Sequence, residues 1–226
     1  MPSFAETFAR NADTLSNDQQ QLLQTKAVAI IGCGGLGGYV IEQLVRIGVG
    51  RLHLVDHDVF APSNCNRQLN ALQSTLGHAK AEVAASRARD IHPFCTVRPF
   101  VADFRAVSED DAFAVDVTVD CLDDIQARRD RAALCNRRTI PLVHGAVSGW
   151  YGQVGVQLPG GDLIEHLYPN RLAAGSPPSV LACTVATIAS LQAAEAVKLL
   201  LDLWSALHNT WLHVDLKEGD FLVNEA

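Results

Sequence analysis

Short apolar runs alternate with longer amphipathic stretches along the first two thirds of the chain. The apolar runs predict strands, and they occupy residues 27–31, 51–55, 95–101, 115–119 and 140–143. The first of these runs is typical of a strand buried on both faces. The stretches between them predict helices, chiefly at 36–47, 77–89 and 125–136. Strands and helices that alternate in this way predict an α/β fold with a Rossmann-like, doubly wound and mostly parallel sheet.

The pattern changes after the fifth apolar run, and the C-terminal part is expected to contain antiparallel strands. A glycine-rich break at 144–149 precedes residues 150–158, whose alternation is typical of an antiparallel strand with one exposed face. Residues 159–178 are rich in Gly and Pro and predict a mobile loop or crossover. A long apolar helix over 180–201 and a hairpin that turns at 217–220 follow.

Glycines cluster immediately after the first apolar run. Gly32, Gly34 and Gly37 fit the pattern G-x-G-x-x-G, whose glycines permit a tight turn, the approach of a phosphate and close packing of the next helix. Asp56 follows the second run about 20 residues later, where a carboxylate meets ribose hydroxyls. A structural turn could explain the glycines alone, but the order of strand, glycines, helix, strand and acid predicts a nucleotide site.

A loop rich in polar residues begins at Asp56 and is expected to belong to the site, because it starts at the carboxyl end of a strand. Its candidate binding residues are Asp58, Asn64, Arg67 and Gln68. Lys80 follows in the first turn of the next predicted helix, where the helix dipole disfavours a cation. This position indicates a nearby anion, although a lysine that extends into solvent would also explain it.

Two nucleotide chemistries fit these residues. A hydride-transfer enzyme needs a nicotinamide pocket and no divalent metal, whereas nucleotidyl transfer needs cations on the phosphates and a carboxylate that holds Mg²⁺. Arg67, Lys80 and Asp123 supply the second set, since Asp123 follows the fourth apolar run and is expected at the same edge of the sheet. The set favours phosphate chemistry and leaves an NAD-linked oxidoreductase as the alternative.

Six motifs occur in order along the chain: GCGGLGG, LVDHD, SNCNRQ, the segment 77–82, DCLDD followed by Arg128, and SLQAAEAVKLL. Together they resemble the MoeB/ThiF/HesA family of ubiquitin-activating-like enzymes, over residues 10–221. The resemblance implies one ThiF-type adenylation domain over 1–226, with a nucleotide-binding part at 1–148 and a carrier-binding part at 149–226. It implies ATP-dependent adenylation of the C-terminal glycine of a Gly-Gly-tailed, ubiquitin-like sulfur carrier. Such carriers include the MoaD type of molybdopterin biosynthesis and the ThiS type of thiamine biosynthesis.

The resemblance also implies a role for each matching residue. The residues that would bind ATP are Gly32, Gly34, Gly35, Gly37, Asp56, Asp58, Asn64, Arg67, Gln68 and Lys80. Asp123 would hold Mg²⁺ at the reaction centre, where Arg67 and Lys80 would contribute to catalysis. Arg10, in a mostly polar and helical segment at 4–26, would reach the ATP site of the neighbouring subunit in a homodimer.

The chain departs from the family in its cysteines. The paired C-x-x-C zinc ligands of many members do not occur, so no zinc site is expected. Some members form a covalent intermediate through a cysteine in the crossover, but residues 159–178 contain none. Cys183 lies just beyond, at a position that resembles a proline in relatives, and we expect a buried structural thiol there. We therefore predict adenylation without a covalent enzyme intermediate, with sulfur from a separate donor.

Composition narrows the partners and the location. The formal net charge of −7 and the lack of a basic block argue against a nucleic-acid partner. The N-terminus lacks the order of a signal peptide and the longest apolar stretch is too short to span a bilayer, so we expect a cytoplasmic protein with no membrane partner. Two further alternatives are a tRNA threonylcarbamoyladenosine dehydratase-like enzyme and a nucleotide-silent partner subunit.

Overall fold

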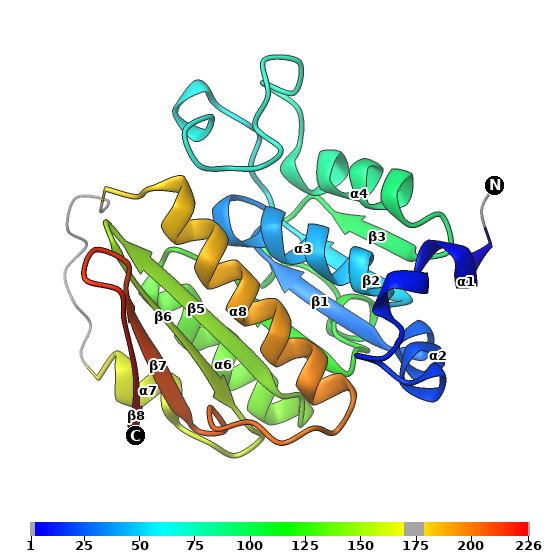
Figure 1. Cartoon of the computed structure of the whole chain (residues 1–226). Helices are drawn as coiled ribbons and strands as arrows, with labels where there is room; N and C mark the ends of the chain where they lie inside the picture. Colours follow the sequence, from blue (N-terminus) through cyan, green and yellow to red (C-terminus); the bar gives the residue numbers. More distant parts are fainter. Residues whose placement is uncertain (1–2, 170–178, 226) are drawn as a thin grey trace.

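One eight-stranded sheet forms the centre of the protein (Figure 1). The computed structural model describes residues 3–169 and 179–225, and the strand order is β3-β2-β1-β4-β5-β6-β7-β8. The strands are β1 (Ala27–Ile31), β2 (Arg51–Val55), β3 (Thr96–Phe100), β4 (Val117–Asp120), β5 (Leu142–Ser148), β6 (Tyr151–Gln157), β7 (Thr210–Asp215) and β8 (Asp220–Glu225). Pairing is parallel from β3 to β5 and antiparallel from β5 to β8. The predicted sheet and its C-terminal antiparallel strands are therefore confirmed.

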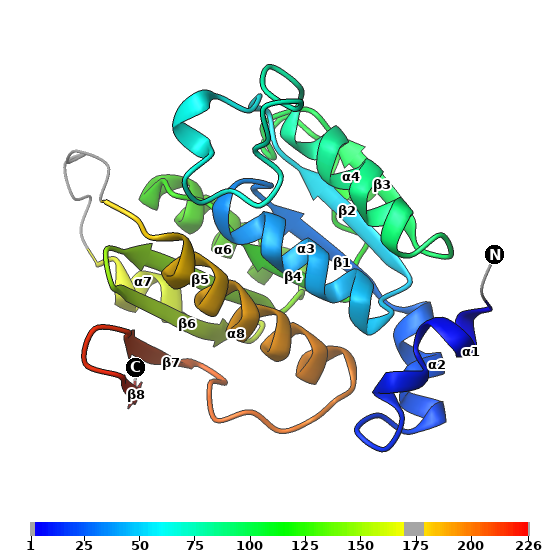
Figure 2. The same ribbon diagram turned by 45° about the horizontal axis from the view of Figure 1, so that its top comes forward.

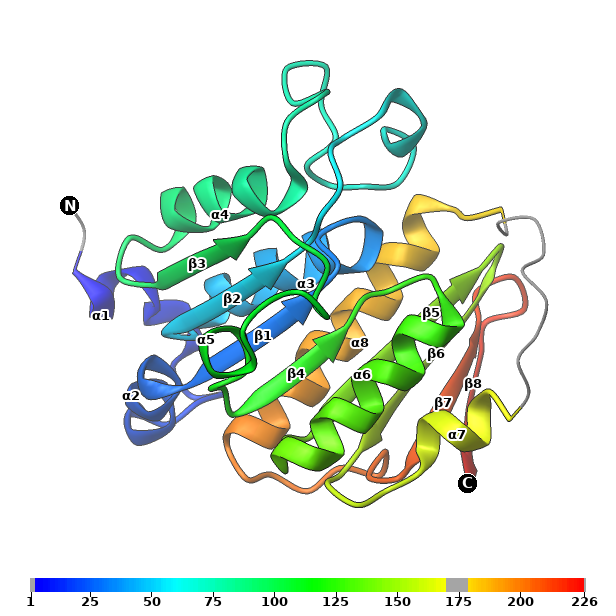
Figure 3. The same ribbon diagram turned by 180° about the vertical axis from the view of Figure 1, so that it is seen from behind.

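Helices cover both faces of the sheet (Figures 1 and 3). One face carries α3 (Gly35–Ile47), α4 (Lys80–Ile91) and α8 (Ala182–Leu200). The other face carries α5 (Glu109–Ala112), α6 (Ile125–Arg138) and α7 (Leu163–Leu167). This is the doubly wound arrangement that the alternation of strands and helices predicts.

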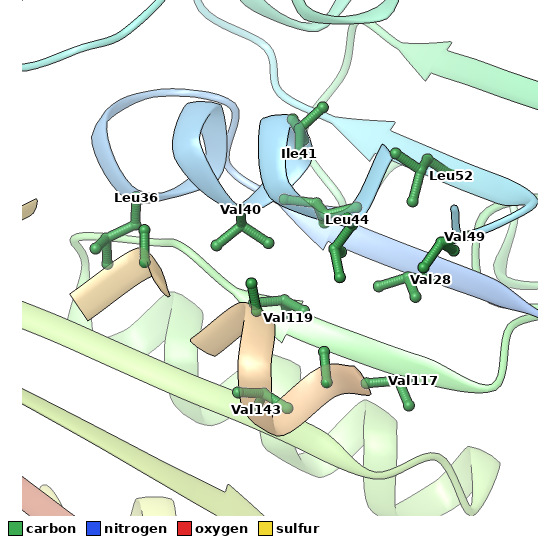
Figure 4. Packing of buried hydrophobic residues seen from close by; sticks show 14 of the residues in the cluster. Val28, Leu36, Val40, Ile41, Leu44, Val49, Leu52, Val117, Val119 and Val143 are labelled. Atoms are coloured by element: carbon green, nitrogen blue, oxygen red, sulfur yellow. The ribbon is translucent and has the colours of Figure 1, made fainter. Parts of the chain in front are cut away.

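The main core lies between the sheet and the helices of the first face. Val40 and Leu44 of α3 point toward the sheet, where they pack with Val28 of β1 and Val119 of β4 (Figure 4). All four side chains are fully buried. The amphipathic spacing of α3 thus places its N-terminus rigidly at the carboxyl end of β1.

The long helix α8 belongs to this core. Its 19 residues are long and apolar enough to span a bilayer, contrary to the expectation that this stretch is too short, but half of its apolar window is buried inside the protein. It packs beside α3 on the same face of the sheet (Figure 2). Its residue Ile188 occupies the space above Gly152 of β6, where an added Cβ would lie 2.3 Å from the Ile188 side chain. These contacts are those of a core helix.

Strand β5 continues through the segment that the sequence indicates as a glycine-rich break. Gly145 pairs with Val154 of β6, and the ladder extends to Ser148. A side chain at Gly145 would collide with Gln192 of α8, whose Cδ atom lies 2.3 Å from the position of an added Cβ. The glycine therefore makes room for a helix and does not end the strand.

Two other segments differ from expectation. Residues 4–26 form α1 (Phe4–Thr7), the 3₁₀ helix η1 (Ala9–Asn11) and α2 (Asn17–Thr25). They are separate because Ser16 starts a new helix, in which its hydroxyl accepts the N–H of Gln19 and its own N–H donates to the Gln19 side chain. The predicted loop at 159–178 contains the short helix α7, and its residues 170–178 lie outside the described residues.

Candidate active site

The candidate site lies where the order of the strands reverses. β1 pairs in parallel with β2 on one side and with β4 on the other. Open α/β sheets bind ligands at such a point, outside the carboxyl ends of the strands. The glycine turn, residues 32–34, follows β1 there, and loop 121–124 follows β4. The two touch, because an added Cβ on Gly32 would lie 2.6 Å from the carbonyl oxygen of Cys121.

The glycine turn presents the N-terminus of α3 to this edge of the sheet. Gly34 is the N-cap residue, so no side chain occupies the first N–H groups of the helix. Free N–H groups and the positive end of the helix dipole favour a phosphate. Gly32 has a φ of +93°, and an added Cβ on Gly37 would lie 1.8 Å from the Gly32 carbonyl oxygen. Turn and helix can therefore meet only with glycine at both positions.

Asp56 joins the glycine turn to the polar loop. One of its carboxylate oxygens accepts the backbone N–H of Cys33 at 2.7 Å, and the other accepts that of Asp58 at 2.8 Å. The residue is 9% exposed. Each carboxylate oxygen can accept further hydrogen bonds, so Asp56 can hold the turn and still receive a ribose hydroxyl.

Lys80 is buried and paired. Its Nζ atom lies 2.9 Å from Oδ2 of Asp58, and the residue is 7% exposed, so the lysine does not extend into solvent. The hydrogen bond and charge of Lys80 hold the pKa of Asp58 below its ordinary value despite partial burial. Asp56, His57 and Asp58 place one potential ligand atom each within 4.8 Å of one another. Because the carboxylate of Asp58 is already paired with Lys80, we assign no metal to these three residues.

The polar loop folds over the glycine turn and contains the 3₁₀ helix η2 (Pro62–Asn64). Asn64 accepts the N–H of Ala61 at 2.9 Å, and Arg67 donates to Oδ1 of Asn66 at 2.8 Å. Both of these predicted ATP-binding residues therefore bond within the loop. Gln68 instead packs against the turn: an added Cβ on Gly34 would lie 3.2 Å from its Nε2 atom. Its Oε1 atom is buried without a partner in the described part of the chain.

Asp123 is exposed in loop 121–124, at the carboxyl end of β4. The next residue, Asp124, caps α6 by accepting the N–H of Ala127 at 2.7 Å. The loop is therefore fixed at its helical end, while the Asp123 carboxylate is available to a ligand. The structure brings Asp123 to the same edge of the sheet as the glycine turn.

Arg10 lies at the opposite end of the sheet. Its neighbour Asn11 donates its side-chain amide to the carbonyl oxygen of Ile47, at the C-terminal end of α3, at 3.1 Å. The site lies at the other end of this helix (Figure 1). The helix has 13 residues and therefore spans roughly 20 Å. The chain does not bring Arg10 to its own site, so a role in catalysis requires a second subunit.

Cys183 is exposed, so the expectation of a buried thiol is wrong. Leu181 and Ala182 beside it are exposed as well, and burial of α8 begins at Thr184. The first turn of the helix precedes its contact with the sheet, and the apolar pattern of the helix does not reveal where that contact begins.

The sequence did not indicate a buried polar network behind loop 121–124. His144 of β5 donates from Nδ1 to Oδ2 of Asp120 at 2.8 Å, and both side chains are fully buried. Burial would raise the pKa of Asp120, but the hydrogen bond from His144 and the charge of Arg128 hold it below its ordinary value. Burial lowers the pKa of His144. The only sequence signal was a histidine at the end of a buried apolar run.

Taken together, the fold and the site define a nucleotide-binding α/β enzyme. The ThiF family model matches residues 8–225. The chain belongs to the ThiF family, an ATP-utilising family of adenylyltransferases, and the predicted family and enzyme class are confirmed.

Relatives differ in the extent of the match. The SAMP-activating enzyme E1 of Haloferax volcanii is 34% identical, over 92% of this chain and 80% of the relative. The sulfur carrier protein adenylyltransferase of Thermus thermophilus is 33% identical, over 89% and 79%. The tRNA threonylcarbamoyladenosine dehydratase of Escherichia coli is 33% identical, over 67% of this chain and 57% of the relative. The crystal structure of E. coli MccB with AMPCPP and MccA has the same fold, with a TM-score of 0.81 and 20% identity over 98% of this chain and 72% of MccB.

Proposed function

We propose that this protein uses ATP to adenylate the C-terminal glycine of a ubiquitin-like sulfur-carrier protein that ends in Gly-Gly. A carboxylate oxygen of the carrier forms a bond to the α-phosphorus of ATP, and the bond from that phosphorus to the β-phosphate breaks and releases pyrophosphate. The observation that carries the proposal is the meeting of the glycine turn, Asp56 and the Asp123 loop at the reversal point of the sheet.

The residues present fit ATP. The buried Oε1 atom of Gln68 lacks a partner within the described residues and lies beside Gly34, as expected for a group that meets a ligand. The uncapped N-terminus of α3 suits a phosphate, and Lys80 is held nearby by Asp58. Arg67 would have to exchange its bond to Asn66 for a phosphate oxygen.

Asp123 fits Mg²⁺, because its exposed carboxylate offers the oxygen ligand that this ion prefers. A bound Mg²⁺ would neutralise part of the negative charge on the phosphates. The role of Asp123 is then to hold the ion at the edge of the sheet where the glycine turn holds the nucleotide.

Similarity along nearly the whole chain supports a protein carrier as the substrate. The SAMP-activating and sulfur-carrier enzymes match over about nine tenths of this chain, whereas the dehydratase matches over 67%. The net charge of −7 also disfavours a tRNA substrate, since RNA binding relies on cationic side chains at the phosphates. A dehydratase-like activity remains the second candidate, because that relative matches at similar identity.

ATP–pyrophosphate exchange with Mg²⁺ and purified ubiquitin-like carriers tests the proposal. We expect exchange with one carrier, its loss when the terminal glycine of that carrier is removed, and its loss in Asp123→Asn. Exchange with threonylcarbamoylated tRNA and with no carrier would support the dehydratase. ATP binding without exchange in either assay would overturn the proposal, and the absence of ATP binding would overturn it in favour of a nucleotide-silent subunit or an NAD-linked enzyme.

We further propose that the enzyme is a cytoplasmic homodimer that receives sulfur from a separate donor. The exposed position of Cys183 makes the absence of a covalent intermediate testable. We expect Cys183→Ser to show the same ATP–pyrophosphate exchange as the wild-type enzyme. We also expect mass spectrometry under denaturing, non-reducing conditions to find no carrier covalently attached to the wild-type enzyme.

A further inference from the structure

The polar network behind loop 121–124 converges on the hydroxyl group of Tyr168, which follows α7. Oη of Tyr168 lies 2.6 Å from Nη1 of Arg128, 2.8 Å from Nε2 of Gln153 and 3.1 Å from Nε2 of His144. His144 in turn contacts Asp120. The five side chains come from β4, β5, β6, α6 and the segment after α7, so the network forms only in the folded protein.

Each hydrogen bond in the network has a defined direction. Ionised Asp120 can only accept, so Nδ1 of His144 carries a proton. A neutral His144 then accepts at Nε2, and the Tyr168 hydroxyl donates to it. The same hydroxyl oxygen accepts from Arg128 and from Gln153. The hydroxyl of Tyr168 therefore uses its donor and both acceptor positions. Removing it would leave Nη1 of Arg128 without this acceptor, and would leave Gln153 and His144 only their mutual contact, in which the two Nε2 atoms lie 3.3 Å apart.

The network holds Leu122, the residue before Asp123, at its backbone N–H and at its carbonyl oxygen. Oδ1 of Asp120 accepts the N–H of Leu122 at 3.0 Å. Nε of Arg128 donates to the carbonyl oxygen of Leu122 at 3.0 Å, and Nη2 of the same guanidinium donates to that oxygen as well. The position of Asp123 is thus set by two side chains that the network orients.

A second set of contacts fixes Tyr168 to α6. Arg129 forms an ion pair with Glu165 of α7 and donates to the carbonyl oxygen of Tyr168 at 3.4 Å. The guanidinium of Arg128 also lies over the Tyr168 ring, 5.5 Å from its centroid. Adjacent arginines on α6 therefore hold both the backbone and the hydroxyl of Tyr168.

We propose that Tyr168 is a positioning residue for adenylation: through Arg128 and His144 it holds loop 121–124 so that Asp123 faces the nucleotide. This inference rests on the proposed function and adds a residue that does not touch the substrate. Because reacting groups must be placed to within about 1 Å, loosening the loop slows the chemical step. We expect ATP binding to be retained, since no side chain of the network bonds to the glycine turn or to Asp56, whose partners are the N–H groups of Cys33 and Asp58.

Tyr168→Phe tests the inference in the full-length enzyme, by ATP–pyrophosphate exchange and by hydrogen exchange of the amides in loop 121–124. We expect kcat to fall about 10- to 100-fold and KM for ATP to change by less than about threefold. We also expect faster hydrogen exchange in the loop. Tyr39→Phe removes a hydroxyl outside the network and is the matched control, with both quantities unchanged.

If Tyr168→Phe does not fold, Gln153→Met removes one donor to the same hydroxyl and is expected to lower kcat less, with the same constant KM for ATP. Wild-type kcat with unchanged hydrogen exchange would overturn the inference, as would equal losses in ATP binding and kcat. If the wild-type enzyme shows no exchange with any carrier, the proposed function fails. The hydrogen-exchange measurement with ATP and Mg²⁺ then still decides whether Tyr168 orders the loop.

Discussion

The carboxylate of Asp56 accepts the backbone N–H of Cys33 at 2.7 Å and so fixes the end of β2 to the glycine turn after β1. Asp56→Asn leaves one oxygen for two backbone donors, because the amide NH₂ group cannot accept the N–H of Asp58 or of Cys33. We expect the free energy of unfolding to fall by about 1–3 kcal/mol. We expect the affinity for ATP to fall at least about tenfold, because a loosened turn no longer presents its N–H groups together. Denaturant unfolding and isothermal titration calorimetry measure the two effects.

Asp116, just before β4, provides a matched control, because it bonds to the first residue of β1 whereas Asp56 bonds to the turn after β1. Its Oδ2 atom accepts the backbone N–H of Ala27, the first residue of β1, also at 2.7 Å. Asp116→Asn should lower stability by a similar amount and leave ATP affinity unchanged. Equal losses of ATP affinity in the two variants would show that Asp56 acts through general stability alone.

Gly37→Ala is expected to be severely destabilising. The new Cβ would lie 1.8 Å from the carbonyl oxygen of Gly32, and Gly37 itself is buried in α3. Relief of this contact would push α3 away from β1, at a cost of about 3 kcal/mol. Gly38→Ala is the control, because its nearest neighbour, Cβ of Leu69, would lie at an ordinary 3.5 Å. Thermal unfolding should show a large loss for Gly37→Ala and no loss for Gly38→Ala.

The sequence predicted those parts of the site that depend on local order. The glycines, the strand before them and Asp56 lie within one βαβ unit, and each follows from a short-range pattern. Asp123 was placed correctly at the edge of the sheet because the carboxyl ends of parallel strands meet there.

The remaining features depend on contacts between distant segments. Gly145 was interpreted as part of a break in the strand. The contact that requires a glycine there is with Gln192 of α8, which is distant in sequence and cannot be read from a local pattern. His144 and Tyr168 likewise acquire their roles only when β5 and the segment after α7 are placed side by side. No pattern of hydrophobic and polar positions contains that information.

His92 should make the stability of the protein depend on pH. Its ring lies 4.9 Å from that of Phe8 and 6.0 Å from that of Phe94, and both of its nitrogen atoms are buried without partners among the described residues. Burial lowers the pKa of His92 below 6.5. The unfolded chain then binds more protons than the folded protein as the pH falls through about 6.5, so stability decreases toward acid.

His92→Phe removes this titrating group and two unpaired polar atoms. We expect a higher melting temperature at pH 7 and a smaller decrease between pH 7 and pH 5, measured by circular dichroism. His53 is the comparison, because burial also lowers its pKa but its Nδ1 atom donates to the carbonyl oxygen of Ala112 at 3.0 Å. His53→Phe should reduce the pH dependence without raising stability at pH 7. A lower melting temperature of His92→Phe at both pH values would contradict this account.

Arg10 should act only on the site of a neighbouring subunit. It lies beside the C-terminal end of α3, roughly 20 Å from the glycine turn of its own chain. Arg10→Ala and Asp123→Ala homodimers should each lack exchange activity. After subunit exchange, a mixed dimer contains one site with Asp123 from the first variant and Arg10 from the second, so that site is complete.

Mixing the two inactive variants should therefore restore activity. Random exchange of equal amounts makes half of the dimers mixed, and one of the two sites in each is complete, so about a quarter of wild-type activity is expected. Ion-mobility or native mass spectrometry confirms that mixed dimers have formed, and the double variant Arg10→Ala/Asp123→Ala mixed with wild type is the control. In each mixed dimer of that mixture, one site has Asp123 but lacks Arg10, and the other site has Arg10 but lacks Asp123. Both sites should therefore be inactive. If mixed dimers form from the single variants and activity does not return, Arg10 does not complete the neighbouring site.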